Sequence, residues 1–548
     1  MPVMEISFKD LEKLVKKPLP RKSDALWDIF SNLKSEVENI EGDNLKIELT
    51  DTNRPDLWCV EGFARSLKTI ISSGKVPDYY AKSSNSTVVV GKGINKVRPF
   101  IATAVLKNVK LNDEMIKQIM QFSERLDTTV GRKRAKTSIG IYNHHMIKFP
   151  VHYKLVSPKT KFVPLGFSEK MTMLDILEKH PKGVEYGHIL KGLKKYPVLV
   201  DSKGKILSMP PIINSNDLGR VTEKTRELFV EVTGTHKEAV KYVLNNIVLA
   251  FADRGATVHS STINYNSRKE RTPDLSNQRM QVEVSEINRV TGLKMKSKEI
   301  VPLLSKMGYG VSRIKESFLD IIIPCYRSDI LSEIDVIEDI AIAYGFNNIE
   351  PKKLRVPSTG EISDIEKISN TSREILVGAG FQEITSFTLV SKELLLNKMN
   401  VKDEDLVEVA NPLSQNAEVL RNRILPSTLE VLEKNTHREY PQKIFECGDA
   451  VVCNKARTDG TETIRCLCSA IADNDSDFTR IKSVLDVYMN SIGVKYVLKP
   501  VKHPSFIDGR TAEIIVDSEK IGIIGEIHPQ VLENFKISVP VSVFEIEL

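Results

Sequence analysis

The sequence of 548 residues is poor in cysteine, in long apolar runs and in net charge. No apolar run reaches the about 18 residues of a membrane helix, and the N-terminal MPVMEISFKD has no basic segment followed by an apolar stretch. We therefore expect no membrane association and no secretory signal. Six cysteines without a CxxC pair are too few for a disulfide framework, so we expect reduced thiols and a cytoplasmic location.

The composition is typical of a globular protein. Hydrophobic residues make up 41% and charged residues 27%, which excludes a largely disordered chain. At about 150 residues per domain, the length predicts three or four domains. The net charge of +6 permits a nucleic-acid partner but does not require one.

Strand-like and helical patterns alternate along the chain, which predicts a multidomain α+β fold. Polar stretches over 81–87 (AKSSNST) and 351–360 (PKKLRVPSTG) are typical of linkers. The expected parts are an N-terminal α/β region over 1–84, a mixed α/β domain over 85–268, a small central α+β domain over 269–350, and helices followed by β-runs over 355–548.

Acidic residues gather in the stretch SDILSEIDVIEDIAIAYG. Asp335, Glu338 and Asp339 stand at i, i+3 and i+4, which places three carboxylates on one face of an expected helix, and Asp329 precedes it. Like charges a few ångströms apart repel by about 4 kcal/mol at an intermediate dielectric. A hard cation such as Mg²⁺, which prefers oxygen ligands, removes that repulsion. The simpler alternative is that acidic residues in the first turns favour the helix dipole.

A short basic run stands out in the second segment. Residues 131–136 read GRKRAK, with four cations in six positions. Such a run contacts phosphate groups in some proteins and is a solvated loop in others. The sequence leaves both interpretations open.

Several stretches, in this order and over nearly the whole chain, resemble the β subunits of phenylalanine–tRNA ligases in their short archaeal and eukaryotic-like form. They are DTNRPDLWCVEGFARSL (51–67), PVLVDSKGKILSMPPIINS (197–215), VTEKTRELFVEVTGT (221–235), IIIPCYRSDILSEIDVIEDIAIAYGFNNIEP (321–351) and VANPLSQNAEVLRNRILPSTLEVLEKN (409–435), followed by IFECGDAV, HPSFIDGRTAEI and IGIIGEIHP.

This resemblance implies partners and a division of labour. Proteins of the family form α2β2 heterotetramers in which the α subunit activates phenylalanine with ATP and transfers it to tRNA(Phe). ATP and phenylalanine would therefore be bound through the complex. Residues 355–548 would form a class II synthetase-like antiparallel sheet with helices. Because no GxGxGxxR helix start is found there, we expect this domain to be silent in ligation.

The resemblance also assigns a metal. Members of the family bind Mg²⁺ through acidic residues of the central domain, which correspond here to Asp329, Asp335, Glu338 and Asp339. The cluster noticed from its spacing and the cluster implied by the family are the same.

Editing is the second activity that the resemblance implies. A hydrophobic pocket rejects an added hydroxyl by only about 10², so a hydrolytic site that removes tyrosine from tRNA(Phe) is chemically sensible. Residues 85–268 resemble the domain that does this. Glu231 is the expected acceptor for the phenol O–H, and Thr233 faces the same side of a strand. Ser208 and Leu199 correspond to other pocket positions.

Plainer interpretations exist for these residues. Taken without the resemblance, Glu231 is an exposed strand carboxylate and Ser208 a turn residue before Pro210 and Pro211. No general base is assigned. Relatives often carry an acidic YDLD-like run where this chain has Tyr142 followed by Asn-His-His, so any role of those acids is in question here.

Three functions compete. The chain is a ligase β subunit that works only with its partner, a free-standing trans-editing hydrolase, or a tRNA-binding scaffold without chemistry. A C-terminal segment of nearly 190 residues (361–548) suited to packing on a partner favours the first over the second. Polar groups at Ser208, Glu231 and Thr233 argue against the third.

Overall fold

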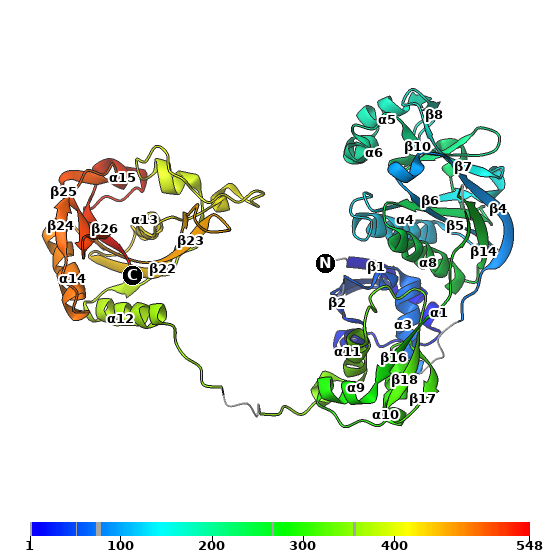
Figure 1. The fold of residues 1–548 in the computed structure, drawn as a ribbon, viewed down its shortest axis with the longest axis horizontal. Helices are drawn as coiled ribbons and strands as arrows, with labels where there is room; N and C mark the ends of the chain where they lie inside the picture. Colours follow the sequence, from blue (N-terminus) through cyan, green and yellow to red (C-terminus); the bar gives the residue numbers. More distant parts are fainter. Residues whose placement is uncertain (1–2, 51, 73–77, 266–267, 354–357) are drawn as a thin grey trace. The chain divides into compact units, whose positions relative to one another are not determined.

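The computed structural model describes residues 3–50, 52–72, 78–265, 268–353 and 358–548. By its internal contacts the chain divides into two units, Met1–Lys352 and Lys353–Leu548, which are described separately (Figure 1). In the described residues, no helix is both long and apolar enough to cross a membrane.

The first unit begins with a small antiparallel sheet and three helices. Ser7 caps the first helix by accepting a hydrogen bond from the backbone N–H of Asp10, and the helix buries Phe8, Leu11 and Val15. The strands, in sheet order, are β1 (Val3–Ser7), β3 (Asn44–Leu49) and β2 (Ser35–Glu41), and the helices are α1 (Phe8–Val15), α2 (Ser23–Phe30) and α3 (Val60–Ser72).

A ten-stranded mixed sheet dominates the first unit (Figure 1). Its path is β12 (Ile213–Asn214), β11 (Ile206–Met209), β10 (Tyr196–Val200), β7 (Val151–Val156), β4 (Lys82–Val90), β14 (Thr257–Asn264), β5 (Phe100–Lys107), β13 (Leu228–Gly234) and β6 (Thr137–Asn143), with β15 (Lys269–Thr272) beside β14. The sheet therefore extends a few residues beyond the predicted segment 85–268 at both ends.

The polar stretch 81–87 is not a linker, contrary to the prediction from its composition. It opens strand β4, which runs parallel to β14 on one side and to β7 on the other. The hydroxyl of Ser84 donates to the carbonyl of Ser260 at 2.7 Å, and Ser86 is buried. Small hydroxyl side chains find partners on the neighbouring strands, so pairing outweighs composition.

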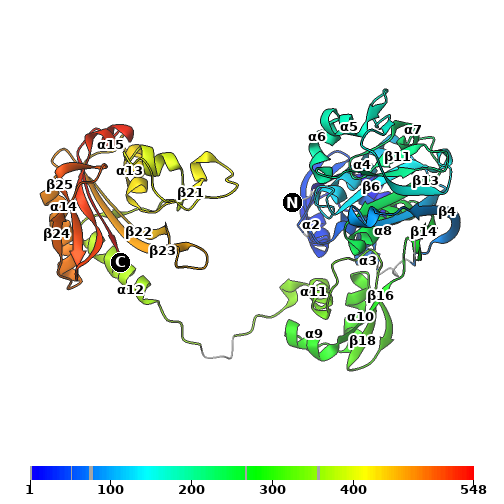
Figure 2. The ribbon, with the colours of Figure 1, turned by 45° about the horizontal axis from the view of Figure 1, so that its top comes forward.

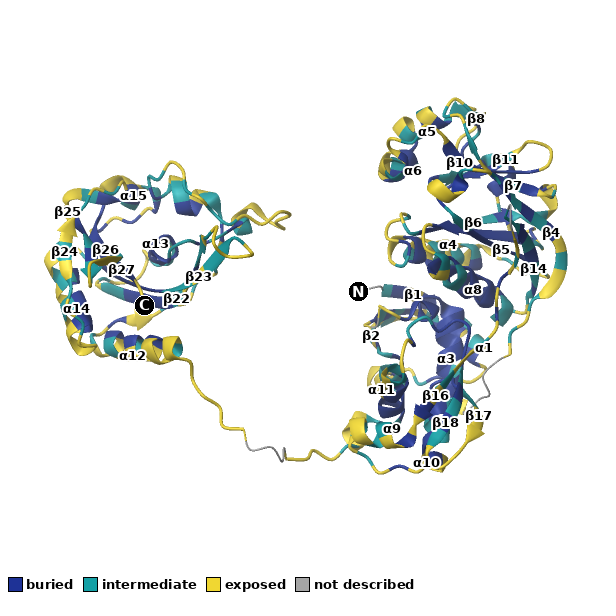
Figure 3. Cartoon of the chain, viewed as in Figure 1, coloured by how far each residue is buried: buried dark blue, intermediate teal, exposed yellow. Residues whose placement is uncertain are grey.

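Helices α4 (Asp113–Thr128) and α8 (Lys237–Asp253) pack against this sheet, and α3 packs against α8. One continuous apolar core joins them to the N-terminal sheet, so the first two predicted domains share a core. Figure 3 shows α8 and the strands beside it as largely buried. The shorter elements are α5 (Met173–Lys179), α6 (Pro181–Tyr186), α7 (Asn216–Gly219), β8 (Lys161–Phe162) and β9 (Met171–Thr172).

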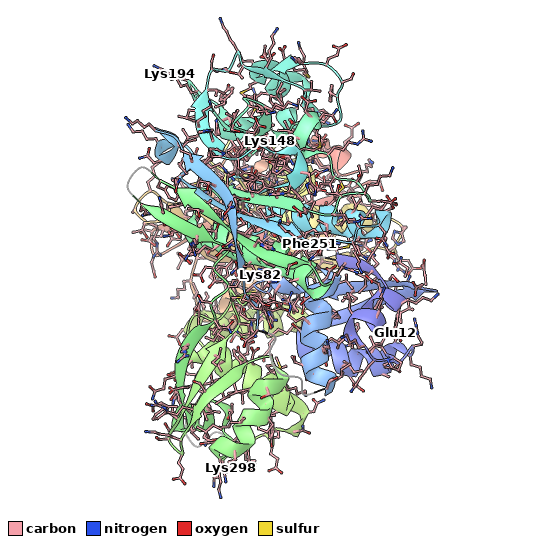
Figure 4. The ribbon with its side chains drawn as sticks, turned by 90° about the vertical axis from the view of Figure 1, so that its right-hand side faces the viewer. Glu12, Lys82, Lys148, Lys194, Phe251 and Lys298 are labelled. Carbon is pink, nitrogen blue, oxygen red and sulfur yellow. The ribbon has the colours of Figure 1, made fainter. Side chains whose placement is uncertain are left out.

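The central segment has a three-stranded antiparallel sheet and helices with their own apolar core. The strands, in sheet order, are β16 (Gln278–Glu283), β18 (Phe318–Ile323) and β17 (Gly310–Ile314), and the helices are α9 (Val284–Thr291), α10 (Ser297–Lys306) and α11 (Glu333–Tyr344). In Figure 4, Lys298 on α10 points outward from this segment.

The second unit is built on a seven-stranded sheet, antiparallel except for its first strand. Along β23, Cys466, Cys468 and Ala470 pack into one core and Leu467 and Ile471 into another, so both faces are covered. The strands are β19 (Gln382–Glu383), β22 (Gln442–Cys453), β23 (Thr461–Ala472), β27 (Val541–Glu547), β26 (Glu519–Ile527), β25 (Phe506–Val516) and β24 (Val497–Pro500), and the helices are α12 (Asp364–Gly378), α13 (Leu425–Lys434), α14 (Phe478–Ser491) and α15 (Pro529–Asn534).

Candidate functional site

A pocket of about 390 Å³ lies in the first unit beside the β6 edge of the ten-stranded sheet. Its walls come from α4, from β6 and β13, from the β11–β12 connection and from the residues after α7, elements that Figure 2 shows gathered together. Phe251 of α8 closes the pocket from within and is labelled in Figure 4 inside this segment. Most of the exposed lining is apolar, and several polar and charged side chains are placed within it, as is usual for small-molecule sites.

Glu231 lies within this pocket, on the central part of strand β13. The strand pairs with β5 and β6, so Glu231 is opposite Thr103 on one side and Gly140 on the other, and only 2% of its surface is exposed. Burial raises the pKa of its carboxyl to about 8. The exposed carboxylate of the plainer interpretation is therefore wrong.

The two oxygens of Glu231 have different surroundings. Oε1 accepts a hydrogen bond from the phenol of Tyr142 at 3.0 Å, whereas Oε2 has no partner among the described residues. The Tyr142 hydroxyl also lies 3.2 Å from Oδ1 of Asn214, which lines the pocket. An unpaired buried oxygen is costly, and Oε2 is thus available to a ligand donor.

Gly140 leaves room for this arrangement. A Cβ atom there would lie 2.2 Å from the Tyr142 hydroxyl and 2.5 Å from Glu231 Oε1. Tyr142 can therefore reach diagonally across β6 to Glu231 only because residue 140 has no side chain. Neither residue was expected to have a role, although a glycine inside the strand pattern SIGIY is a sign of close approach between chains.

Ser208 and Leu199 lie opposite each other on paired strands β11 and β10. Ser208 lines the pocket and is buried, and its hydroxyl interacts with the phenol of Tyr142. Leu199 is fully buried and packs in the core behind the pocket together with Tyr142 and Phe229, not in its lining. Of these two predicted pocket residues, the structure brings only Ser208 to the cavity wall.

Thr233 faces the same side of β13 as Glu231 but does not line the pocket. Its hydroxyl accepts a hydrogen bond from Nε of the buried Arg98 at 2.9 Å and lies 3.1 Å from the hydroxyl of Ser138, which does line it. Thr233 thus contacts the pocket only indirectly, through Ser138 in its lining. Arg98 was not found from the sequence because it lies 135 residues away from Thr233.

Asp127 is a second buried carboxyl of the pocket that sequence reasoning missed. It lies near the end of α4, where burial raises its pKa to about 7 against the lowering effect of Arg134, whose Nε is 3.2 Å from Oδ2. The sequence feature that could have indicated Asp127 is its place next to Leu126, on the apolar side of a helix, where an acid is unusual. The divergent Asn143, His144 and His145 do not belong to the described lining.

The four predicted metal ligands meet around a different, small cavity of about 20 Å³ in the first unit. Asp335 caps α11 by accepting backbone N–H bonds from Leu331 and Ser332 at 2.8 and 2.7 Å, as the helix-dipole alternative predicts. Glu338 pairs with Lys34 at 2.9 Å. Two of the carboxylates are thus already engaged.

The other two acids share one arginine. Nη2 of Arg327 lies 2.6 Å from Asp329 Oδ2 and 2.7 Å from Asp339 Oδ2, and Tyr309 donates to Asp339 at 2.6 Å. Although burial opposes it, the charge of Arg327 lowers the pKa of Asp329. These contacts supply the neutralisation for which a cation was expected.

The residues present therefore do not fit a hydrated magnesium ion in this arrangement. The cavity has room for about one water-sized sphere, whereas Mg²⁺ keeps several waters. Among the described residues, no group of three His, Cys, Asp or Glu side chains is arranged to hold a metal ion.

Family models match two adjacent segments in the second half of the chain. Residues 349–548 match the family described as phenylalanyl tRNA synthetase beta chain CLM domain, and residues 280–346 match the tRNA synthetase B5 domain.

Relatives with similar sequences cover the chain from end to end. The phenylalanine–tRNA ligase beta subunit of Pyrococcus abyssi is 41% identical over 100% of this chain and 99% of its own, and that of Archaeoglobus fulgidus is 38% identical over 100% and 98%. A crystal structure of an N-terminal fragment of the phenylalanyl-tRNA synthetase beta subunit from Pyrococcus horikoshii is 38% identical. It covers 63% of this chain and 100% of the fragment with a TM-score of 0.61.

Proposed function

Because the chain belongs to the family of phenylalanine–tRNA ligase beta subunits, we propose that its own chemistry is the hydrolysis of tyrosyl-tRNA(Phe) in the pocket around Glu231. As an aminoacyl-tRNA ligase subunit it takes part in phenylalanyl-tRNA synthesis with an α subunit and tRNA. The α2β2 stoichiometry, the supply of ATP and phenylalanine through the α subunit and a cytoplasmic location belong to the proposal. The six cysteines, all free, are consistent with that location.

The unpaired oxygen of Glu231 carries this proposal. A tyrosine side chain entering the pocket brings one phenol O–H group, with which the unpaired Oε2 of Glu231 can form a hydrogen bond. Phenylalanine has no such group and would leave the buried oxygen unpaired. Sites that hydrogen-bond a hydroxyl reject the analogue that lacks it by about 10⁴ to 10⁵. The pocket is thus selective in the direction that editing requires.

The pocket's contribution is binding and orientation. Water attacks the ester carbonyl carbon, the bond to the ribose oxygen breaks, and tyrosine and tRNA leave. The described lining contains no histidine or cysteine, so a nucleophile–histidine pair has no place in the step. Apolar lining residues and the buried Phe251 exclude bulk water from the side chain.

The experiment is a comparison of Glu231→Ala and Glu231→Gln in the purified complex with the α subunit. Both variants should hydrolyse tyrosyl-tRNA(Phe) more slowly while phenylalanine charging is unchanged. The matched control is Glu238→Gln, an exposed acid of the same domain. Hydrolysis at the wild-type rate in both Glu231 variants would remove Glu231 from the pocket's function.

Phenylalanine-dependent ATP–pyrophosphate exchange tests the partnership. The chain alone should show no exchange, and its mixture with the α subunit should show it. Failure of the mixture, with both chains folded, would favour the free-standing editor or the tRNA-binding scaffold.

Magnesium remains a prediction that the family resemblance supports and the ion pairs oppose. Calorimetric titration of the complex with MgCl₂ tests it, with Asp335→Asn and Glu338→Gln as variants. Binding that both variants weaken would establish the cluster as a metal site. Identical titrations in all three proteins would leave the acids as ion-pair and capping residues.

A further inference from the structure

The basic run GRKRAK forms an unusual turn between α4 and β6. Arg132, Lys133 and Arg134 have φ angles of 49°, 50° and 67°, so three consecutive residues other than glycine adopt the left-handed conformation. L-amino acids with a Cβ adopt it rarely and then as single residues. Conformations of this kind persist only where the surroundings hold them and are frequent at ligand sites.

Backbone hydrogen bonds hold the turn against the end of α4. The N–H groups of Arg132, Lys133 and Arg134 donate to the carbonyls of Thr129, Thr128 and Asp127 at 2.9, 3.0 and 2.9 Å. Each basic side chain therefore leaves the turn in a defined direction, and the turn is not a loose solvated loop.

The third basic residue anchors the turn to the pocket. Nη1 of Arg134 donates to the carbonyl of Ile212 at 2.9 Å, and its guanidinium lies over the ring of Tyr186 at 4.5 Å from the centroid. Arg134 and Ile212 both line the cavity that contains Glu231. The turn is thus part of the pocket's rim.

The charges left without partners at this rim are positive. The acids of the rim are engaged, since Glu124 pairs with Lys182 at 3.3 Å and Asp127 with Arg134. By contrast, Arg132, Lys133 and the pocket-lining Arg220 are exposed. Among the described residues, the side chains of these three cations have neither an ion-pair nor a hydrogen-bond partner.

We propose that Arg132 and Lys133 bind backbone phosphates at the 3′ end of tRNA while the attached amino acid occupies the pocket. This rests on the proposed function, because an ester of the terminal ribose brings nucleotides to the rim when its side chain is inside. Exposed guanidinium and ammonium groups suit phosphate oxygens, and phosphate contacts position nucleic acid without reading its sequence.

The test is the hydrolysis of tyrosyl-tRNA(Phe) by the purified complex at several concentrations of monovalent salt. For single strands, each phosphate contact contributes about 0.7 to the slope of log affinity against log salt. The double variant Arg132→Gln/Lys133→Gln should therefore flatten the slope of log kcat/KM by about 1.4. At 0.1 M salt, a slope that is lower by about 1.4 corresponds to a KM for the double variant about 25-fold above that of wild type. Because the contacts are equally strong in the ground and transition states, kcat should not change.

Two control proteins separate charge from other effects. Lys203→Gln/Lys205→Gln removes two exposed lysines of the same domain that do not line the pocket, and it should keep the wild-type KM and slope. Arg132→Lys/Lys133→Arg keeps both charges on the turn and should also behave as wild type. Equal losses in the charge-conserving variant would show that the effect is not electrostatic and would overturn the proposal.

The outcomes distinguish this proposal from the one on which it rests. If wild type hydrolyses tyrosyl-tRNA(Phe) and Glu231→Gln is impaired, but Arg132→Gln/Lys133→Gln keeps its KM and salt slope, the phosphate contacts are refuted and the editing pocket stands. If wild type does not hydrolyse this substrate at all, the proposed function fails. A matching loss in phenylalanine charging would also overturn the assignment, because it would make the turn a general tRNA contact.

Discussion

Replacement of Gly140 by alanine tests the geometry around Glu231 most directly. The added methyl would lie 2.2 Å from the Tyr142 hydroxyl and 2.5 Å from Glu231 Oε1, so both groups must move. Overpacking of this kind costs about 1–3 kcal/mol of stability. Displacing Glu231 also removes its hydrogen bond to the substrate phenol, worth about 2 kcal/mol, which corresponds to about 30-fold in kcat/KM.

The assay is hydrolysis of tyrosyl-tRNA(Phe) by the complex, with phenylalanine charging measured on the same preparation. Gly140→Ala should lose about 30-fold in hydrolysis and keep its charging rate. Gly187→Ala is the matched control, because a Cβ there meets Leu177 no closer than 3.4 Å, an ordinary contact. Full hydrolysis by a folded Gly140→Ala protein would refute the proposed role of the Tyr142–Glu231 pair.

Two further predictions concern buried charge. The folded-state pKa of Glu231, about 8, is above its unfolded value of 4.5, so its contribution to stability is complete below pH 4.5 and is lost as the pH rises to 8. The loss in free energy of unfolding is at most about 5 kcal/mol. It should be absent in Glu231→Gln. The measurement is hydrogen exchange of β13 in both proteins as a function of pH, corrected for the pH dependence of the intrinsic exchange rates. Arg327→Leu removes the arginine that Asp329 and Asp339 share and leaves Asp329 only the more distant Arg54, at 3.9 Å. It should cost about 3–5 kcal/mol, seen as faster exchange in α11; unchanged exchange there would show that the shared ion pair is not stabilising.

Local patterns in the sequence were sufficient for the elements that carry the candidate site. The period of two over Phe229 to Thr233 predicted a strand with Glu231 and Thr233 on one side, and β13 has that form. Apolar residues recur with helical spacing over 113–126 and 237–254, and the structure contains α4 and α8 there. In the two helices the apolar spacing and the backbone period agree, so neighbouring residues are enough to specify them; β13 is buried on both faces.

Contacts between distant segments could not be predicted in this way. The stretch 81–87 has the composition of a linker, and only its pairing with β14 makes it part of a strand. The carboxylates near Asp335 were correctly grouped by their helical spacing. Lys34, the partner of Glu338, lies 304 residues earlier in the chain, and Arg54 lies 3.9 Å from Asp329 although it too is far away in sequence. No spacing rule relates the two regions.

The candidate pocket shows the same division. The family resemblance selected Glu231 and Ser208, and the alternation of a strand, a local property, placed Thr233 on the same side as Glu231. Whether Glu231 is exposed or buried, and which of its oxygens is left for a ligand, depends on the register of β6 against β13. That register places Gly140 opposite Glu231 and lets Tyr142 reach it. This register is set by the packing of the whole sheet, which brings together Tyr142 and Glu231 from positions 89 residues apart. The same packing removes water from the two side chains. Because water is removed, the pKa and the hydrogen bonding of the carboxyl change.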